Sequence, residues 1–369
     1  MKIVLLGSLA ESLANFRGPL IREMVQRDYE VVATAPDAPE GIAEAVGALG
    51  ARFEQVAFSR TGMNPIADFG GMFRLLRFLR QEKPDGLIAY TAKPVIYGTL
   101  AARLSGVKRV GALVTGLGFA FTEGSGTKRR VARIFAWLLY RIMLRRASCV
   151  IFQNEDDRAL FMQLKLIGQK QTSGIVNGSG VDLAQFQRTA LPEEPVFLMI
   201  GRLLGDKGVR EYATAAAALL RQVPGARALL VGWRDTSPDA VSAEELETWQ
   251  SNGIEYLGRL ADVRPALAAA SVVVLPSYRE GTPRSVLEGM AMGRAIITTD
   301  APGCRNTVAH GINGFKVPPR NAQALEMAML TLARDARLRS TMGAASCEMA
   351  ERLFEAGAVA KATLDSFGF

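Results

Sequence analysis

Two glutamates eight residues apart carry the strongest chemical signal in this 369-residue chain. Glu280 and Glu288 lie in LPSYREGTPRSVLE (residues 275–288), where an apolar run gives way to a Gly/Pro turn and then to a helical pattern from Ser285. The start of a helix presents unsatisfied N–H groups and the positive end of a macrodipole, which suits a phosphate. We therefore expect the two acids to face different parts of one extended anionic ligand. The alternative is a helix-start carboxylate and a solvated helix face.

A basic loop, GRLLGDKG at residues 201–208, follows the apolar run Val196–Ile200. Its cations Arg202 and Lys207 are suited to neutralise a departing diphosphate, since an arginine can clamp two phosphate oxygens at once. A surface turn with an ordinary basic pair is the competing interpretation. The loop lacks the Gly-Lys-Ser/Thr of a Walker sequence.

Three loops in the amino-terminal half also follow apolar runs and are candidates for contacting an acceptor. The first, residues 7–19, lacks the complete Gly-x-Gly-x-x-Gly fingerprint, so a bound dinucleotide is not supported. Each loop is equally compatible with a plain turn between a strand and a helix. The candidate acceptor residues are Asn15, Phe16, Arg17, Thr91, Lys93, Thr115 and Gly116.

Residues 128–146 contain seven cations, no acid and many apolar side chains. A basic helix with aromatic residues and a broad apolar face is typical of attachment to an anionic membrane surface. A second basic and apolar segment lies at residues 72–80, and the alternative for both is a core helix with a basic edge. The candidate membrane residues are Arg129, Arg130, Arg133, Trp137, Arg141 and Arg145.

The net charge of +8 is unevenly distributed. Residues 1–190 carry 25 Lys/Arg against 16 Asp/Glu, a net charge of +9, and residues 191–369 carry 19 against 20. The basic half suggests an anionic partner, either nucleic acid or membrane headgroups. The only histidine, His310, argues against multi-histidine metal sites and Ser-His triads, and no Asp-x-Asp clamp occurs, so we expect no metal and no cofactor.

Three scattered cysteines favour a reducing compartment over a disulfide framework. No run of about 18 apolar residues suggests a membrane span, and the apolar start reads as a buried strand rather than a signal peptide. We expect a cytoplasmic protein or one attached to a membrane surface.

Short apolar runs alternate with longer helical patterns along the whole chain, which predicts parallel sheets buried on both faces. We expect an α/β fold of two facing, doubly wound Rossmann-like domains, residues 1–180 and 181–350, with the ligand in a cleft between them. A terminal helix, residues 351–369, is expected to pack back on the first domain, and a hinge is expected near residues 177–195. The predicted strands are Ile3–Leu6, Glu30–Thr34, Gly86–Ala89, Arg109–Thr115, Cys149–Gln153, Gly174–Val176, Val196–Ile200, Ala228–Val231, Ile254–Leu257, Val272–Pro276, Ala295–Thr298 and Gly314–Val317.

Taken together, these motifs resemble glycosyltransferase family 4, whose members have the GT-B fold. The resemblance covers nearly the whole chain and rests on the Glu-x7-Glu motif, the loop at 201–208, and Gly303-Cys304 leading to GINGF at 311–315. Within the family, the chain is similar to bacterial enzymes that add a hexosamine, often N-acetylgalactosamine, to a saccharide on undecaprenyl diphosphate. That narrower likeness rests on Phe16-Arg17, Phe58-Ser59-Arg60, Asn64-Pro65, Gly116-Leu117-Gly118, and Gly232-Trp233-Arg234-Asp235 with Pro238.

The resemblance implies a role for each motif in holding a UDP-sugar. Arg202 and Lys207 would hold the donor diphosphate, Glu288 the ribose hydroxyls and Glu280 the sugar hydroxyls. Many members have a histidine where this chain has Thr91-Ala92-Lys93, so the sequence does not support a side-chain base there. The implied donor residues are Gly201, Arg202 and Lys207, then Gly258, Arg259 and Leu260 near the uracil, and Glu280, Gly281, Thr282, Pro283, Ser285, Val286, Leu287 and Glu288.

The sequence therefore predicts a retaining, metal-independent glycosyltransferase with Arg202, Lys207 and Glu280 as catalytic residues. Its expected partners are a UDP-sugar, a lipid-linked saccharide and an anionic membrane at the cytoplasmic face of the inner membrane, without nucleic acid. Two alternatives stay open at this stage. One is a UDP-sugar 2-epimerase on the same fold, and the other is a basic nucleic-acid-binding protein, for which no recognisable module is present.

Overall fold

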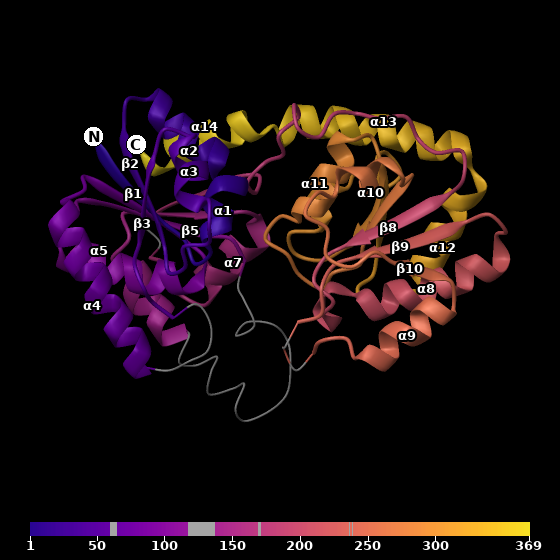
Figure 1. Cartoon of the computed structure of the whole chain (residues 1–369), viewed down its shortest axis with the longest axis horizontal. Coiled ribbons are helices and arrows are strands. Elements are labelled where there is room, and N and C mark those ends of the chain that lie inside the picture. Colours follow the sequence, from indigo (N-terminus) through magenta and orange to yellow (C-terminus); the bar gives the residue numbers. More distant parts are fainter. Residues whose placement is uncertain (60–64, 117–136, 169–170, 236, 238) are drawn as a thin grey trace. The chain divides into compact units, whose positions relative to one another are not determined.

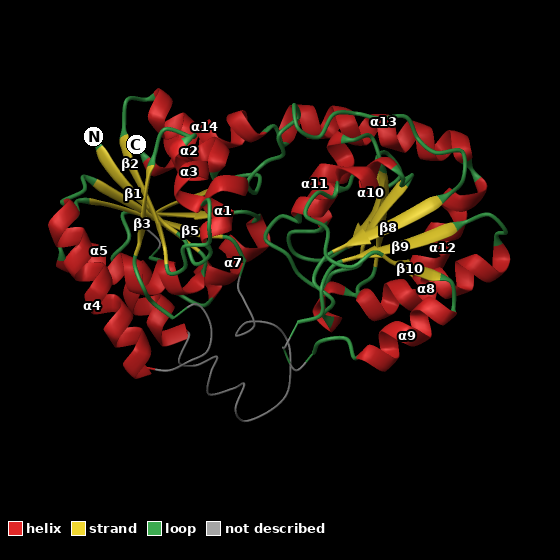
Figure 2. Ribbon diagram, viewed as in Figure 1, coloured by secondary structure: helices red, strands yellow, loops and turns green. Residues whose placement is uncertain are grey.

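The computed structural model describes residues 1–59, 65–116, 137–168, 171–235, 237 and 239–369 (Figure 1). They form two compact units: unit 1 comprises Met1–Ser179 with Ala356–Phe369, and unit 2 comprises Gly180–Glu355. In each unit helices cover both faces of a parallel sheet (Figure 2). The predicted α/β architecture with two Rossmann-like, doubly wound units is confirmed.

The sheet of unit 1 has seven parallel strands in the order β3-β2-β1-β4-β5-β6-β7. The chain winds outward from β1 through β2 and β3, then returns to place β4 on the other side of β1. Strand β3 was not predicted from the sequence, because its charged and aromatic residues form a partly exposed edge strand rather than an apolar run. The strands are β1 (Lys2–Leu6), β2 (Glu30–Ala35), β3 (Arg52–Gln55), β4 (Gly86–Tyr90), β5 (Arg109–Val114), β6 (Cys149–Phe152) and β7 (Thr172–Ile175).

The last helix of the chain, α14, belongs to unit 1 and packs on α2 and β6. Its Phe367 ring lies so close to Gly111 that a Cβ there would sit 2.6 Å from the ring. Arg27 fixes the end of the chain through Asp365 at 2.8 Å and the Phe369 carbonyl at 3.0 Å. The helices of unit 1 are α1 (Ala10–Asn15), α2 (Gly18–Gln26), α3 (Ile42–Gly47), α4 (Pro65–Glu82), the π-helix η1 (Pro94–Gly98), α5 (Thr99–Leu104), α7 (Glu155–Gln163) and α14 (Ala356–Phe367), with a further helical segment at residues 137–144.

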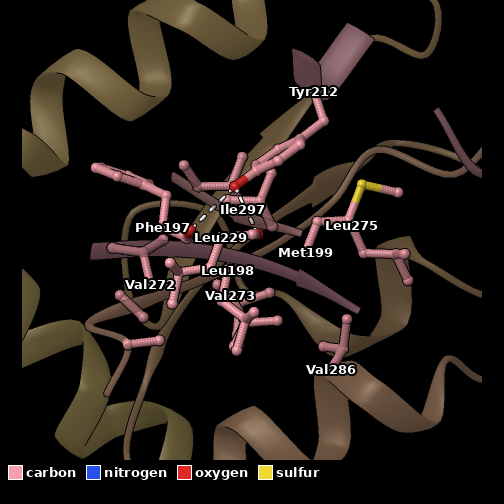
Figure 3. Packing of buried hydrophobic residues seen from close by; sticks show 14 of the residues in the cluster. Phe197, Leu198, Met199, Tyr212, Leu229, Val272, Val273, Leu275, Val286 and Ile297 are labelled. Carbon is pink, nitrogen blue, oxygen red and sulfur yellow. Dashed lines mark hydrogen bonds between the residues drawn. The ribbon is translucent and has the colours of Figure 1, made fainter. Parts of the chain in front are cut away.

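The sheet of unit 2 has six parallel strands in the order β10-β9-β8-β11-β12-β13, so β8 and β11 are its central neighbours. Figure 3 shows how Tyr212 enters the core above these strands and donates to the carbonyls of Phe197 and Leu229, each at 3.0 Å. Burial raises the pKa of this phenol, which keeps it a neutral donor. The strands are β8 (Val196–Ile200), β9 (Arg227–Val231), β10 (Ile254–Tyr256), β11 (Val272–Leu275), β12 (Ala295–Thr299) and β13 (Gly314–Val317).

A fully buried arginine ties the segment before β8 to unit 2. Arg294 donates to the carbonyls of Leu267, Thr189 and Ala190, and burial lowers its pKa to about 10. The segment after residue 188 is thus held by unit 2. The helices of unit 2 are η3 (Gly205–Lys207), α8 (Val209–Gln222), α9 (Ala243–Ser251), α10 (Arg264–Ala268), α11 (Arg284–Ala291), η4 (Arg305–Thr307), α12 (Ala322–Arg334) and α13 (Ala336–Leu353). Among the described residues, no helix is long and apolar enough to cross a membrane.

Candidate functional site

The basic loop and the glutamate turn meet at the carboxyl ends of β8 and β11. Because these strands are neighbours at the point where the winding of the sheet reverses, the loops that follow them lie side by side. The Nζ atom of Lys207 lies 2.6 Å from Oε1 of Glu280, and both side chains are 17% exposed. Two residues 73 positions apart, selected separately from the sequence, are therefore ion-paired partners at the edge where open α/β sheets bind ligands.

Backbone contacts fix the geometry of this pair. The Asp206 carbonyl accepts hydrogen bonds from the Tyr278 N–H at 2.9 Å and from the Ser277 hydroxyl at 3.2 Å. Gly208 has φ +71°, and a Cβ on it would lie 2.1 Å from the Pro276 carbonyl oxygen. Only glycine allows the loop to approach β11 this closely, so the motif glycine serves to position Lys207.

Asp206 is a second carboxylate near the Lys207–Glu280 pair, and it was not predicted as a site residue from the sequence. Burial raises the pKa of Asp206 and the nearby Glu280 charge raises it further, while Lys207 lowers it. Lys207 therefore stabilises the negative charge of two acids. The position of Asp206 next to Lys207 in the loop was the only sequence signal for it.

The turn that carries Glu280 is supported from the other side by residues 302–303. The Glu280 N–H donates to the Pro302 carbonyl at 3.0 Å. Gly303 has φ +76°, and a Cβ on it would lie 2.1 Å from the Glu280 carbonyl oxygen. The Gly303-Cys304 motif thus has a physical role: its backbone packs directly on the turn.

Helix α11 begins at Arg284, one residue before the predicted start, and Glu288 lies on its buried face. The Glu288 side chain is 8% exposed, and its Oε1 lies 2.7 Å from Nε of Arg284. Burial raises the pKa of Glu288, and Arg284 lowers it. The interpretation of Glu288 as part of a solvated helix face is therefore wrong. Gly289 lies against the sheet, since a Cβ there would sit 2.6 Å from Val273.

Arg202 pairs with a different carboxylate from the one that Lys207 contacts. Its side chain is 45% exposed and forms an ion pair with Asp235 at 3.3 Å, in the loop that follows β9. Hydrogen bonds from Ser237 lower the pKa of Asp235, with a smaller contribution from Arg202. The structure thus distributes the two cations of the basic loop over two different carboxylates.

The proposed uracil contacts follow β10. The Gly258 carbonyl accepts from the Gly232 N–H at 2.9 Å, which joins the loops after β10 and β9. The Arg259 guanidinium lies 5.4 Å from the Trp233 ring centroid, and this indole is 44% exposed. Leu260 is partly buried against the core. Trp233 offers a flat, accessible surface at the edge of the sheet where Glu280 and Lys207 also lie.

The candidate acceptor residues of unit 1 have different environments. Asn15 and Phe16 are exposed, whereas Arg17 is 5% exposed. Thr91 follows β4 with φ +68°, and its hydroxyl donates to the Ser8 hydroxyl at 2.9 Å. Thr115 and Gly116 follow β5 and are partly exposed.

Lys93 forms an ion pair with Asp68, an acid that was not predicted as a site residue from the sequence. Its Nζ lies 2.6 Å from Oδ1 of Asp68, which is 6% exposed, and the Tyr97 hydroxyl donates to Oδ2 at 3.1 Å. The π-helix Pro94–Gly98 carries Tyr97, and such helices are frequent at functional sites. Asp68 lies in a helix that reads from sequence as basic and apolar, so only the fold reveals its partners.

The candidate membrane segment is described only in part. Arg129, Arg130 and Arg133 lie outside the described residues, as do Arg60, Asn64, Leu117, Gly118 and Pro238 of the family likeness. Trp137 packs against the core and donates from its indole to the Leu164 carbonyl at 3.0 Å. Arg141 stacks on that indole and Arg145 is exposed. The Trp137 ring therefore contributes to the packing of unit 1, and attachment of this segment to a membrane stays a prediction.

Comparison with known proteins gives matches over both units. A family model described as a glycosyl transferase 4-like domain matches residues 14–172, and one described as glycosyl transferases group 1 matches residues 194–335. The N,N'-diacetylbacillosaminyl-diphospho-undecaprenol alpha-1,3-N-acetylgalactosaminyltransferase of Campylobacter jejuni is 30% identical over 92% of this chain and 91% of its own. The UDP-Gal:alpha-D-GlcNAc-diphosphoundecaprenol alpha-1,3-galactosyltransferase of Escherichia coli is 26% identical over 73% of this chain and 72% of its own.

Solved structures show the same fold over the full length. HepE from Anabaena, in complex with UDP and glucose, aligns with a TM-score of 0.79 at 17% identity and covers 100% of this chain and 99% of its own. The sucrose-phosphate synthase of Thermosynechococcus elongatus aligns with a TM-score of 0.81 at 19% identity, over 100% and 98% of the two chains. At such low sequence identities these solved structures establish only the fold. The Campylobacter relative, at 30% identity, shows that the sequence as well belongs to the family. The chain therefore belongs to glycosyltransferase family 4 and is a glycosyltransferase with the GT-B fold.

Proposed function

We propose that this enzyme transfers an N-acetylhexosamine, with N-acetylgalactosamine as the leading candidate, from a UDP-sugar to a polyprenyl-diphosphate-linked saccharide, with retention at the anomeric carbon. The observation that carries the proposal is the Lys207–Glu280 pair at the switch point of unit 2. It combines a cation for a leaving phosphate with a carboxylate for sugar hydroxyls at one place. The activities by which the Campylobacter and Escherichia relatives are named suggest the lipid-linked acceptor class and the sugars.

The proposed chemistry is a front-face displacement. The acceptor hydroxyl attacks the anomeric carbon on the side from which the diphosphate leaves, so a C–O bond to the acceptor forms as the C–O bond to the β-phosphate breaks. The proton of the acceptor hydroxyl passes to an oxygen of the departing diphosphate. Lys207 and the first turn of α11 stabilise the charge that develops there, in the role that a metal ion has in other transferases.

The remaining donor contacts follow the positions of their side chains. Glu280 orients sugar hydroxyls, and Glu288, on the buried face of α11, accepts hydrogen bonds from the ribose. The exposed Arg202 also binds the diphosphate, by exchanging its partner Asp235 for a phosphate oxygen. The uracil lies by Gly258 to Leu260, and the exposed Trp233 stacks on it.

A lipid-linked acceptor requires the enzyme to reach a membrane surface, and unit 1 offers exposed apolar side chains for this. Phe69 and Phe73 are 58% and 61% exposed on one face of α4, which continues into the exposed Arg77 and Arg80. Exposed aromatic rings followed by arginines suit the interface of an anionic bilayer. The proposal places the enzyme at the cytoplasmic face of the inner membrane as a peripheral protein.

A transfer assay tests the proposal directly. Purified enzyme is incubated with a panel of UDP- and GDP-sugars and a polyprenyl-diphosphate-linked disaccharide, in buffer with EDTA, and products are resolved by mass spectrometry. The expected result is extension of the lipid-linked acceptor by one N-acetylhexosamine in an α-linkage, identified by NMR. Conversion of the sugar nucleotide without acceptor would instead identify an epimerase, and activity that needs added magnesium would refute the metal-independent step.

A further inference from the structure

We propose that the switch point of unit 1 holds a phosphate-binding site built around Arg17, which takes a phosphate of one of the two diphosphate-bearing substrates. The inference rests on the proposed function for the identity of the substrates. The site itself is inferred from the side chains at the carboxyl ends of β1 and β4. These strands are neighbours inside the sheet, and its winding reverses between them.

Within the described part of the chain, no acid pairs with the buried guanidinium of Arg17. The residue is 5% exposed, and its Nε has no hydrogen-bond partner among the residues that the structure describes. The guanidinium lies over the Tyr90 ring, whose centroid is 4.9 Å from Cζ. Burial lowers the pKa of Arg17, which reflects the cost of holding a charge there. An arginine stays charged in proteins, so a buried guanidinium without a carboxylate calls for an anion from outside the chain.

The surroundings hold Arg17 in place without neutralising it. The Tyr90 hydroxyl lies 2.7 Å from the Ser12 hydroxyl. Gly7 makes room for this ring, since a Cβ at that position would lie 2.3 Å from the Tyr90 hydroxyl oxygen. Gly7, which follows β1, thus makes room for Tyr90, which ends β4 and presents the ring on which the guanidinium stacks.

Polar groups suited to a phosphate converge on the same strand ends. The Thr91 hydroxyl donates to the Ser8 hydroxyl at 2.9 Å, across the ends of β4 and β1. Thr91 adopts φ +68°, a conformation that costs a β-branched residue energy and occurs most often at functional sites. Burial raises the pKa of Tyr90, and the charge of Asp37 raises it further. The Oδ1 atom of Asp37 accepts a hydrogen bond from the Ala10 N–H at 3.0 Å. This acid is thus held by the backbone at the start of α1.

The ligand chemistry is a phosphate oxyanion, and it has two possible sources: the donor diphosphate and the diphosphate of the lipid-linked acceptor. Isothermal titration with UDP and with geranyl diphosphate separates them, because the second probe carries no nucleotide. The variants are Arg17→Met, at the residue that precedes α2, and, as a matched control on α2 itself, the exposed Arg22→Met. Loss of charge-assisted hydrogen bonds should weaken one probe by about 10- to 100-fold.

A selective loss of geranyl diphosphate binding assigns the site to the acceptor, and a selective loss of UDP binding assigns it to the donor. Unchanged affinity for both probes overturns the proposal. Thermal unfolding without ligand gives a second readout: Arg17→Met should be at least as stable as wild type, because it removes an unpaired buried charge. A loss of stability with both affinities intact would show that Arg17 has a structural role only. These measurements do not require turnover, so they can be interpreted even if the transfer assay fails.

Discussion

Replacing Lys207 by methionine tests whether its ammonium stabilises the leaving diphosphate. Lys207 Nζ lies 2.6 Å from Glu280 Oε1, and both side chains are 17% exposed, so the group acts at the edge of the low-dielectric interior. Two unit charges about 4 Å apart interact by ~4 kcal/mol at an effective dielectric of about 20. Removal of one preorganised charge-stabilising group typically costs about 10²- to 10³-fold in kcat. We expect a loss of that size for Lys207→Met, with the donor KM changed less than about tenfold.

The assay is steady-state transfer with saturating lipid-linked acceptor in EDTA-containing buffer. Lys361→Met, at an exposed position on α14, controls for the loss of a lysine elsewhere. In a double-mutant cycle with Glu280→Gln, we expect coupling of about 1–3 kcal/mol, because the two groups are in direct contact. An unchanged kcat for Lys207→Met, or fully additive effects of the two substitutions, would refute the reasoning.

Three further predictions concern the supports of this site. Gly208→Ala should destabilise unit 2 by about 3 kcal/mol or more, because its Cβ would meet the Pro276 carbonyl, whereas Gly106→Ala, with φ +86° and open space, should cost only about 1–2 kcal/mol in thermal unfolding. Because burial raises the pKa of Glu288 above its usual 4.5, wild-type stability relative to Glu288→Gln should be greatest below that pH and fall as pH rises through the raised pKa; parallel stability curves between pH 4 and 8 would contradict this. Trp233→Ala should raise the donor KM by about tenfold with kcat little changed if the indole stacks on the base, and an unchanged KM would remove it from the site.

Most strands were predictable because they consist of short apolar runs, and the inner strands of each sheet are buried on both faces. β8 and β13 begin and end where the apolar runs do, and other strands differ from their predictions by a residue or two at the ends. β3 escaped because it lies at the edge of its sheet, where one face stays partly exposed and charged residues are tolerated. A search for apolar runs misses an edge strand of this composition, although it detects β7, β10 and β13, which also lie at sheet edges.

The site was predictable as a set of motifs but not as a set of partners. Lys207 and Glu280 were each predicted from their local context. Their pairing follows from the fact that β8 and β11 are neighbours in the sheet, which the sequence does not reveal. Arg202 shares a loop with Lys207 yet pairs with Asp235, because the chain turns between them. Such pairings depend on the order of strands in a sheet, which one sequence does not reveal.

Because of the Lys207–Glu280 pair, a substitution of Glu280 should affect the affinity for UDP and the turnover of the whole UDP-sugar in opposite directions. In the unliganded site Glu280 neutralises Lys207, so an incoming diphosphate must share or replace that carboxylate. If Glu280 serves the sugar, UDP alone gains nothing from it and is repelled by its charge, whereas a UDP-sugar recovers hydrogen bonds to its hydroxyls. Glu280→Gln should therefore bind UDP more tightly than wild type in titration calorimetry while its turnover of the UDP-sugar falls. Weaker UDP binding by this variant would mean that the carboxylate positions the lysine for the phosphate instead, and the sugar would have to be oriented by other residues of the turn.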